Sequence, residues 1–390
     1  MRTFVIFIAL STLWTHLALA ESILLDKDVP LKAIANISSA DAKRDLELLI
    51  ATLDKAYGGK VVLPEQQYGN LISNLRKIDV ANSMSSDDLC DEIGKLTEQI
   101  NDNHLTVHIG NRTCQRTWPT ASVGPNAGNG QSNSTWSISS KVITNQNIPV
   151  LAIQKMSPSN SPEWRGFLEA VAALKAQDAQ FIIDLRGNPG GDSTKGKQMA
   201  AILYGINSID KLPMPQKTTY RVRTGDALAL MANSTWLSIQ GFHDNNKESP
   251  DYLNNLYKSQ SELVNNAVLG QTSTQEVQQV GNNNIDLSNS IKKPVYILVD
   301  RHCGSSCELT LEALESLPNI QTVGENTTGV VQYGNVGALY LPASHIVVRI
   351  ATQGSIYDDG RKIEKVGYTP MWRVPSQTDA LDYTLKKFFK

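Results

Sequence analysis

A side-chain hydroxyl that could act as a nucleophile lies in the segment VYILVDRHCGSSCELTLEAL, residues 295–314. Its first six residues predict a buried strand, and the spacing of apolar residues from about Ser306 to Leu317 predicts a helix. A serine at this turn would lie at the helix N-terminus, where unpaired N–H groups and the helix dipole favour developing negative charge. Ser305 or Ser306 is therefore a candidate nucleophile. A plainer interpretation is that Ser305 and Glu308 form the S-x-x-E capping box of an ordinary helix.

The loop DLRGNPGGD, residues 184–192, could stabilise the anion that such a nucleophile creates. It follows a predicted buried strand, FIID, and its three glycines allow the backbone to turn sharply and to expose N–H groups. The N–H of Gly190 or Gly191 would then be a donor of an oxyanion hole.

A phosphate-binding loop is an alternative use of the same glycines. Gly191, Gly196 and Lys197 match the pattern G-x4-G-K. The next residue of that motif is a Ser or Thr that holds magnesium, and Gln198 stands in its place. The sequence therefore predicts no nucleotide site.

Two histidines in DNHLTVH, residues 102–108, could supply a base or bind a metal ion. His104 and His108 have the spacing of the zinc motif H-E-x-x-H, but Leu105 replaces its glutamate. The pattern is therefore only a weak sign of a metal site, and no metal is expected. Each histidine could also be structural, as an isolated histidine usually is.

These signals occur in a fixed order along the chain. DLRGNPGG is followed by a predicted strand, by the Ser-x-x-Glu turn, by VGENTTG at residues 323–329 and by IEKVGYTP at residues 363–370. In this combination the chain resembles the tail-specific, or C-terminal processing, serine peptidase family over most of residues 184–372. The DNH at residues 102–104 is an outlying match.

The resemblance implies a crotonase-like ββα core in which Ser305 is the nucleophile and Ser306 supplies a backbone N–H to the oxyanion hole. One branch of the family pairs the serine with a lysine that follows the glycine of G-E-x-T-x-G. Val330 stands at that position here. A serine–lysine dyad is therefore not expected.

The tricorn-core-like branch of the family implies a different base. Its base is the histidine of an upstream D-x-H motif, and a glutamate of the E-x-x-G-x-x-P motif completes the relay; His104 and Glu364 match these positions. The residue before that histidine is often a serine, and here it is Asn103, which could form a hydrogen bond in its place. His302, three residues before Ser305, is the second candidate for the base.

The elements that must position these residues follow from apolar periodicity. Helical spacing within residues 39–100 predicts a small helical N-terminal region, 21–110, which carries the histidine motif. Residues 111–148 are rich in Gly, Ser, Asn and Thr and predict a polar connection, too short for the PDZ module that many members of the family carry. From residue 149 to 390, strand-like runs alternate with helical patterns. We therefore expect an α/β (α+β) fold whose core contains a βαβ sheet.

The four cysteines suggest an oxidising compartment. Four cysteines allow three pairings, of which the simplest joins Cys90 to Cys114 and Cys303 to Cys307. The first pair would bracket the histidine motif and the second the serine turn. No CxxC spacing suggests a metal site.

The first twenty residues resemble a cleavable secretory signal, with Arg2, an apolar run and Ala18-Leu19-Ala20 before Glu21. The chain is therefore expected to be exported, periplasmic or secreted, without stable insertion in a membrane. Its formal net charge of -2 and its lack of a basic block give no sign of a nucleic-acid partner.

Three functions follow from these patterns. The first is an exported serine peptidase that acts on a peptide or protein, needs no cofactor and uses Ser305, His104 and Glu364. The second is a catalytically inactive peptide-binding or scaffold protein of the same fold, suggested by Val330 and Asn103. The third is a metal hydrolase that uses His104 and His108. No particular oligomeric state is indicated.

Overall fold

The computed structural model describes residues 23–114, 135–157, 162–267, 274–279 and 286–389. They form two compact units. The described residues of the first unit come from Met1–Arg116, Thr218–Val277 and Gln332–Ile356, and those of the second from Thr117–Lys217, Gln278–Val331 and Tyr357–Lys390. The expected signal segment, residues 1–20, lies outside the described residues.

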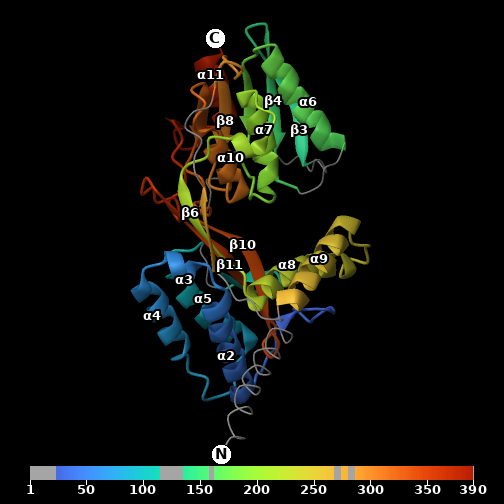
Figure 1. Ribbon diagram of the computed structural model, residues 1–390, viewed down its shortest axis with the longest axis vertical. Helices are drawn as coiled ribbons and strands as arrows, with labels where there is room; N and C mark the ends of the chain where they lie inside the picture. The colour runs from blue at the N-terminus through green and yellow to red at the C-terminus, as the bar shows by residue number, and fades with distance from the viewer. Residues whose placement is uncertain (1–22, 115–134, 158–161, 268–273, 280–285, 390) are drawn as a thin grey trace, which may run out of the picture. The chain divides into compact units, whose positions relative to one another are not determined.

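The second unit is built on a six-stranded sheet with the order β12-β9-β8-β5-β4-β3. Strands β3, β4 and β8 are labelled in Figure 1. Strands β12, β9, β8, β5 and β4 pair in parallel with their neighbours. Only β3 is antiparallel to its neighbour, β4. The expected βαβ sheet is thus confirmed. The strands are β3 (Trp136–Ile143), β4 (Gln146–Ile153), β5 (Phe181–Asp184), β8 (Val295–Val299), β9 (Ile320–Gly324) and β12 (Trp372–Arg373).

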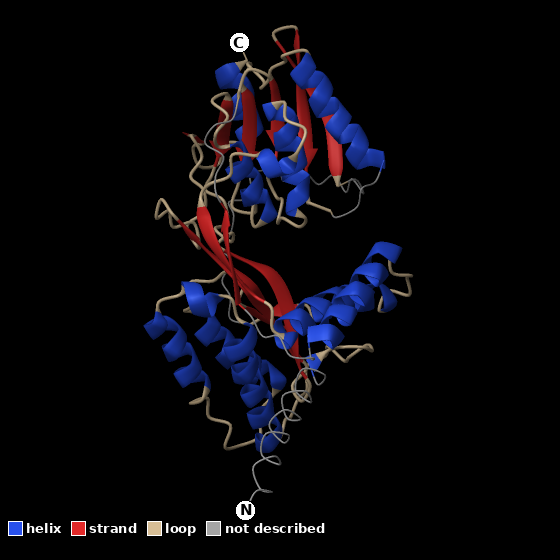
Figure 2. Ribbon diagram, in the orientation of Figure 1, coloured by secondary structure: helices blue, strands red, loops and turns tan. Residues whose placement is uncertain are grey.

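Helices cover both faces of this sheet, because its central strands are apolar on both sides (Figure 2). Ile183 and Ile297 lie in the core cluster that includes α6, α7 and α10, whereas Ile182 and Leu298 contact α11 on the opposite face. The helices of this unit are α6 (Pro162–Ala176), α7 (Ser193–Tyr204), the short η1 (Ile209–Lys211), α10 (Ser306–Leu314) and α11 (Ala380–Phe388).

The sequence of helix α7 explains where it begins and ends. The Asp192 side chain accepts a hydrogen bond from the Thr194 N–H at the N-terminus, and Gly205, with φ of 75°, ends the helix in the left-handed conformation. Inside α7, Gly196 lies so close to α10 that an added Cβ would be 1.8 Å from Thr310 Oγ1. This glycine, which sequence alone also placed in a phosphate-binding pattern, permits close helix packing.

The first unit contains the expected N-terminal helices and a second sheet. Its strand order is β2-β1-β11-β6-β7, with β10 paired to β11. The strands are β1 (Thr106–Ile109), β2 (Arg112–Thr113), β6 (Lys217–Val222), β7 (Thr274–Gln279), β10 (Tyr333–Leu341) and β11 (Ile346–Tyr357). The helices are α2 (Ser39–Ala56), α3 (Gly59–Val62), α4 (Glu65–Leu75), α5 (Ser86–Glu98), α8 (Gly225–His243) and α9 (Asp251–Ala267).

The first unit also takes two pieces of the range 149–390, which the sequence suggested as one core. Residues 218–277 and 332–356 pack there because β11 pairs with β1 and the apolar residues of α8 and β10 join the cluster around α2 and α5. Over the described ranges, no helix combines the length and the apolar character needed to cross a membrane.

Candidate active site

Ser305 occupies the sharp turn between β8 and α10. Its backbone has φ of 54° and ψ of -117°, a conformation that costs energy for a residue with a side chain. Ser305 is partly exposed, whereas Gly304 and Ser306 on either side are buried. A strained serine between a strand and a helix is the arrangement that presents a nucleophile at a helix N-terminus.

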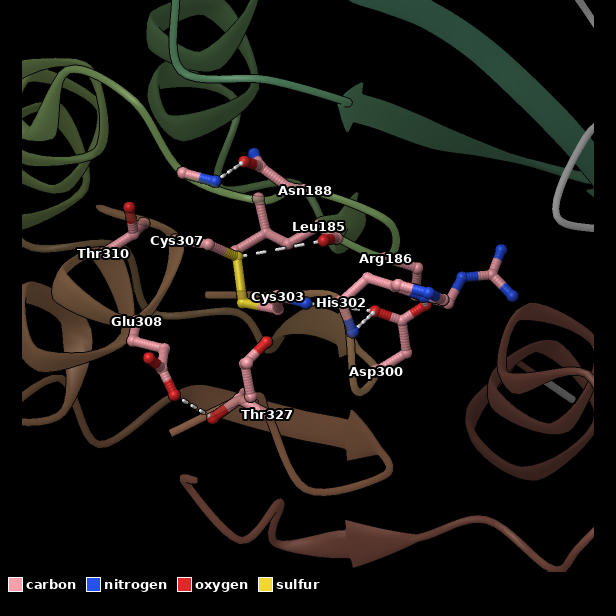
Figure 3. The surroundings of a disulfide bond; sticks show 12 residues. Leu185, Arg186, Asn188, Asp300, His302, Cys303, Cys307, Glu308, Thr310 and Thr327 are labelled. Atoms are coloured by element: carbon pink, nitrogen blue, oxygen red, sulfur yellow. Dashed lines mark hydrogen bonds and ion pairs between the residues drawn. A yellow bond between two sulfur atoms is a disulfide. The ribbon is translucent and has the colours of Figure 1, made fainter. Parts of the chain in front are cut away.

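A disulfide and an aspartate shape this turn (Figure 3). Cys303 and Cys307 form a disulfide with a Cα–Cα distance of 5.4 Å, as expected from the simplest pairing. Asp300 Oδ1 accepts the N–H groups of His302 at 3.0 Å and Cys303 at 3.2 Å, and that of Gly187 at 3.0 Å. The turn is therefore held both to itself and to the glycine-rich loop.

Asn188 connects the glycine-rich loop to the nucleophile turn, although the sequence analysis did not single it out. Its backbone carbonyl accepts the Gly304 N–H at 3.1 Å, and its fully buried side chain donates to the Ile153 carbonyl at 2.9 Å. Asn188 Oδ1 also accepts the Gly190 N–H at 2.8 Å. The Gly190 N–H is thus already used inside the loop.

Gly190 and Gly191 are glycines because other backbone comes very close. A Cβ on Gly190 would lie 2.8 Å from the Ser306 nitrogen and 2.9 Å from Ser305 Cβ, and one on Gly191 would lie 2.0 Å from the Met156 carbonyl oxygen. Their φ values of 100° and 132° also disfavour any residue with a side chain. The glycine-rich loop therefore lies directly against the nucleophile turn.

The backbone groups of Gly191 face away from Met156. The Gly190 carbonyl accepts the Met156 N–H, and the Met156 carbonyl accepts the Asp192 N–H. In this parallel pairing the N–H and carbonyl of Gly191 itself point away from the Met156 strand. The carbonyl accepts the Ser306 hydroxyl at 2.5 Å. Neither the Gly191 N–H nor the Ser306 N–H donates to an acceptor within the part of the chain described.

Glu308 lies at the centre of the hydrogen bonds around the turn. Its Oε2 accepts the N–H groups of Ser305 at 3.2 Å and Val330 at 2.8 Å, and its Oε1 accepts the Thr327 hydroxyl at 2.5 Å and the Gly329 N–H at 2.8 Å. Burial raises the pKa of the Glu308 carboxyl above its usual value, and these four bonds oppose that effect. The capping-box glutamate expected from the sequence thus binds far more than the helix end.

The C-terminal motif joins the same network through Thr327. Thr327 Oγ1 accepts the Tyr368 N–H at 2.7 Å, and the Gly329 carbonyl accepts the Lys365 N–H at 2.8 Å. Glu364, only 2% exposed, lies in the turn that these bonds anchor. The structure therefore brings together, in the second unit, the four motifs that the sequence showed in order between residues 184 and 370.

His104 belongs to the first unit, in the turn that precedes β1. Asp102, itself 2% exposed, accepts the His104 N–H at 2.7 Å through Oδ1 and the Tyr57 hydroxyl at 2.9 Å through Oδ2. The aspartate of the D-x-H motif thus fixes the backbone that carries His104. Cys90 and Cys114 form the expected second disulfide, with a Cα–Cα distance of 5.7 Å.

The two other histidines of interest have different surroundings. His302 is exposed, and its Nδ1 lies 3.5 Å from Asp300 Oδ2. His108 Nε2 and Nδ1 lie 2.8 Å from Thr106 Oγ1 and 3.1 Å from Thr113 Oγ1, respectively. Among the described residues, no group of three or more His, Cys, Asp or Glu side chains could hold a metal ion.

A strained serine beside a glycine-rich loop, on a parallel sheet covered by helices, is an arrangement typical of the serine hydrolase class. The sequence model of Peptidase family S41 matches residues 147–374, more than half of the chain. The chain belongs to this family of serine peptidases, and the resemblance to tail-specific peptidases is confirmed. No curated protein sequence matches it.

Solved structures of similar fold are also found. One is a candidate peptidase from Parabacteroides merdae ATCC 43184, with 14% identity and a TM-score of 0.52 over 90% of this chain and 97% of that one. Another is mature CPAF, with 13% identity and a TM-score of 0.53 over 90% of this chain and 96% of that one. At such identities the likeness concerns the fold, and it confirms the expected fold class.

Proposed function

We propose that this chain is an exported serine peptidase with Ser305 as its nucleophile, His104 as its general base and Glu364 as the residue that orients the base. The observation that carries the proposal is the strained Ser305 backbone at the start of α10, beside a glycine-rich loop. Such strain is retained where the surrounding structure enforces it and function uses it.

In the proposed mechanism, neutral His104 accepts the proton of the Ser305 hydroxyl as its oxygen attacks the carbonyl carbon of a peptide bond. The resulting oxyanion accepts hydrogen bonds from the N–H groups of Gly191 and Ser306. Gly191 is preferred to Gly190 because Asn188 already accepts the Gly190 N–H.

The tetrahedral intermediate collapses when the protonated base donates its proton to the leaving amine. Water, deprotonated by the same base, then hydrolyses the acyl-enzyme. A general base contributes about 10²-fold to 10⁴-fold in rate. One oxyanion donor contributes about 10²-fold to 10³-fold.

Export is proposed from the signal-like residues 1–20, and the two disulfides support it. All four cysteines are paired, which is typical of proteins folded in an oxidising compartment. We expect the mature chain to begin at Glu21. Intact mass of the secreted protein from an expressing host tests this, and retention of residues 1–20 would contradict it.

The proposed activity is tested by labelling the purified mature protein with a fluorophosphonate and locating the modified peptide by mass spectrometry. We expect label on Ser305, none in Ser305→Ala, and labelling slowed by at least about 100-fold in His104→Ala because the proton acceptor is lost. His302→Ala is the matched control, and it should label at the wild-type rate. The reverse result for the two histidines would make His302 the base.

A binding protein that has lost catalysis is the second candidate. This candidate is favoured by Val330, which occupies the position of the lysine in the serine–lysine dyad. The Val330 side chain packs against the nucleophile turn: its Cγ1 would lie 2.8 Å from a Cβ added to Gly304. Absence of label on protein shown to be folded by circular dichroism would support this candidate and refute the peptidase. Under either function the partner is a peptide or protein.

A further inference from the structure

We propose that Glu308 is the positioning residue of the nucleophile: its buried carboxylate holds the Ser305 backbone in its strained conformation by tying it to residues 327–330. This inference rests on the proposed function of Ser305. It assigns to Glu308 a role that neither the sequence pattern nor the proposed relay of Ser305, His104 and Glu364 includes.

The origin of the four donors separates this role from helix capping. A capping box uses N–H groups of the helix end alone. Here only the Ser305 N–H comes from the helix end, whereas Thr327, Gly329 and Val330 lie in a segment that follows β9. A simple cap does not explain these three additional bonds.

The site is built for a carboxylate that accepts every bond. The three N–H groups can only donate, and the Thr327 oxygen already accepts the Tyr368 N–H. A glutamine at position 308 would place an NH₂ group against at least one of these donors. Glu308 is completely buried and, among the described residues, pairs with no basic side chain, so these four bonds are what stabilises it.

The network also explains how the strain at Ser305 persists. A residue with φ of 54° reverts to a relaxed backbone unless several contacts hold it. Glu308 Oε2 accepts the Ser305 N–H and the Val330 N–H together, while the Val330 side chain packs against Gly304. The position that carries a lysine in the dyad branch here supports the turn with its N–H and its side chain.

Glu312, one helical turn further along α10, offers a matched control. It is also completely buried, and it accepts bonds from Lys217, at 2.8 Å, and from the Tyr357 and Tyr368 hydroxyls. Its bonds do not involve Ser305. Glu308→Gln and Glu312→Gln therefore both disturb a buried carboxylate of α10, but only the first alters the nucleophile turn.

The test measures fluorophosphonate labelling of Ser305 against reagent concentration, which separates the maximal labelling rate from the half-saturating concentration. In Glu308→Gln we expect the maximal rate to fall by about 100-fold, as a misplaced reacting group would cause, with the half-saturating concentration nearly unchanged. Thr327→Val, which removes one of the four bonds, should cause a smaller fall in the same quantity. Glu312→Gln should label as the wild type does.

Equal slowing in Glu308→Gln and Glu312→Gln would overturn the proposal, because it would show a general loss of structure. Wild-type labelling of Glu308→Gln would also overturn it. Hydrogen exchange provides a readout independent of activity: the amides of residues 303–309 should exchange faster in Glu308→Gln and not in Glu312→Gln. If the wild type does not label, the proposed function fails, and unchanged exchange in Glu308→Gln would separately refute the positioning role.

Discussion

At the scale of single residues, the two neighbouring glycines of the loop have different roles. Gly190 lies against Ser305 and Ser306 and gives its N–H to Asn188, whereas Gly191 pairs beside Met156 and leaves its N–H directed elsewhere. Both positions need glycine for the same steric reason. Only the direction of the N–H groups separates them as oxyanion donors.

Gly191→Ala should slow the labelling of Ser305 by at least about 100-fold, the effect of losing one oxyanion donor. Its Cβ would lie 2.0 Å from the Met156 carbonyl oxygen, so the loop must move and carry the N–H with it. Gly187→Ala is the control: φ there is also positive, at 75°, but no atom lies within 4 Å of the added Cβ. Similar labelling rates in the two variants would refute the role of Gly191.

At the scale of elements, helix α11 fixes the start of the glycine-rich loop. Asp379, the N-cap of α11, accepts the Asp382 N–H and also pairs with Arg186 at 2.7 Å; Arg186 in turn pairs with Asp184 at 2.7 Å. Burial alone would raise the pKa of Asp379, but these interactions outweigh it and hold the pKa below its usual value. The loop is thereby attached to the face of the sheet opposite α10.

Asp379→Asn should lower the free energy of unfolding at pH 7 by about 1 kcal/mol, because asparagine keeps the cap but loses the charge pair. A lowered folded-state pKa contributes stability above the unfolded value, about 3.9, and this contribution is lost as pH falls through the folded value. The difference from wild type should therefore shrink as pH falls below about 3.9, the unfolded-state pKa of an aspartate. Urea unfolding at pH 7 and at a series of lower pH values tests this, with the exposed Asp382→Asn as control. A difference in the free energy of unfolding that does not depend on pH would contradict it.

At the scale of the whole molecule, each unit has its own hydrophobic core and its own disulfide. Cys90–Cys114 lies in the first unit, with a sequence separation of 24 residues, and Cys303–Cys307 in the second, with a separation of 4. The cluster that includes α2, α5, β1 and β11 is separate from the cluster that includes β5, β8 and α10. The two cross-links should therefore stabilise different parts of the chain.

The double variant Cys90→Ala/Cys114→Ala should lose about 3 kcal/mol of stability, because the cross-link restricts a longer loop of the unfolded chain. Hydrogen exchange should become faster in α5 and β1 but not in α10. Cys303→Ala/Cys307→Ala, which opens a shorter loop, should lose less and show faster exchange in α10. Uniformly faster exchange in both variants would show that the two cores unfold as one.

The sequence was sufficient for most of the second unit. Strands β5 and β8 are short, continuous apolar runs and helix α10 has a clear start, so periodicity places them well. Helices α8 and α9 were not expected. α8 contacts both α9 and β10, so its apolar residues lie on more than one side and its helical periodicity is weak.

The sequence by itself determined the family, through four motifs in order, and it indicated Ser305, His104 and Glu364 as the proposed relay. Only the tertiary structure decided which cysteines pair, how separated segments form each unit and what Glu308 binds. It also decided which glycine N–H donates to an acceptor within the loop and which does not. The physical reason is that these features depend on the direction of N–H and carbonyl groups in segments far apart along the chain. Residue types and spacing do not determine those directions.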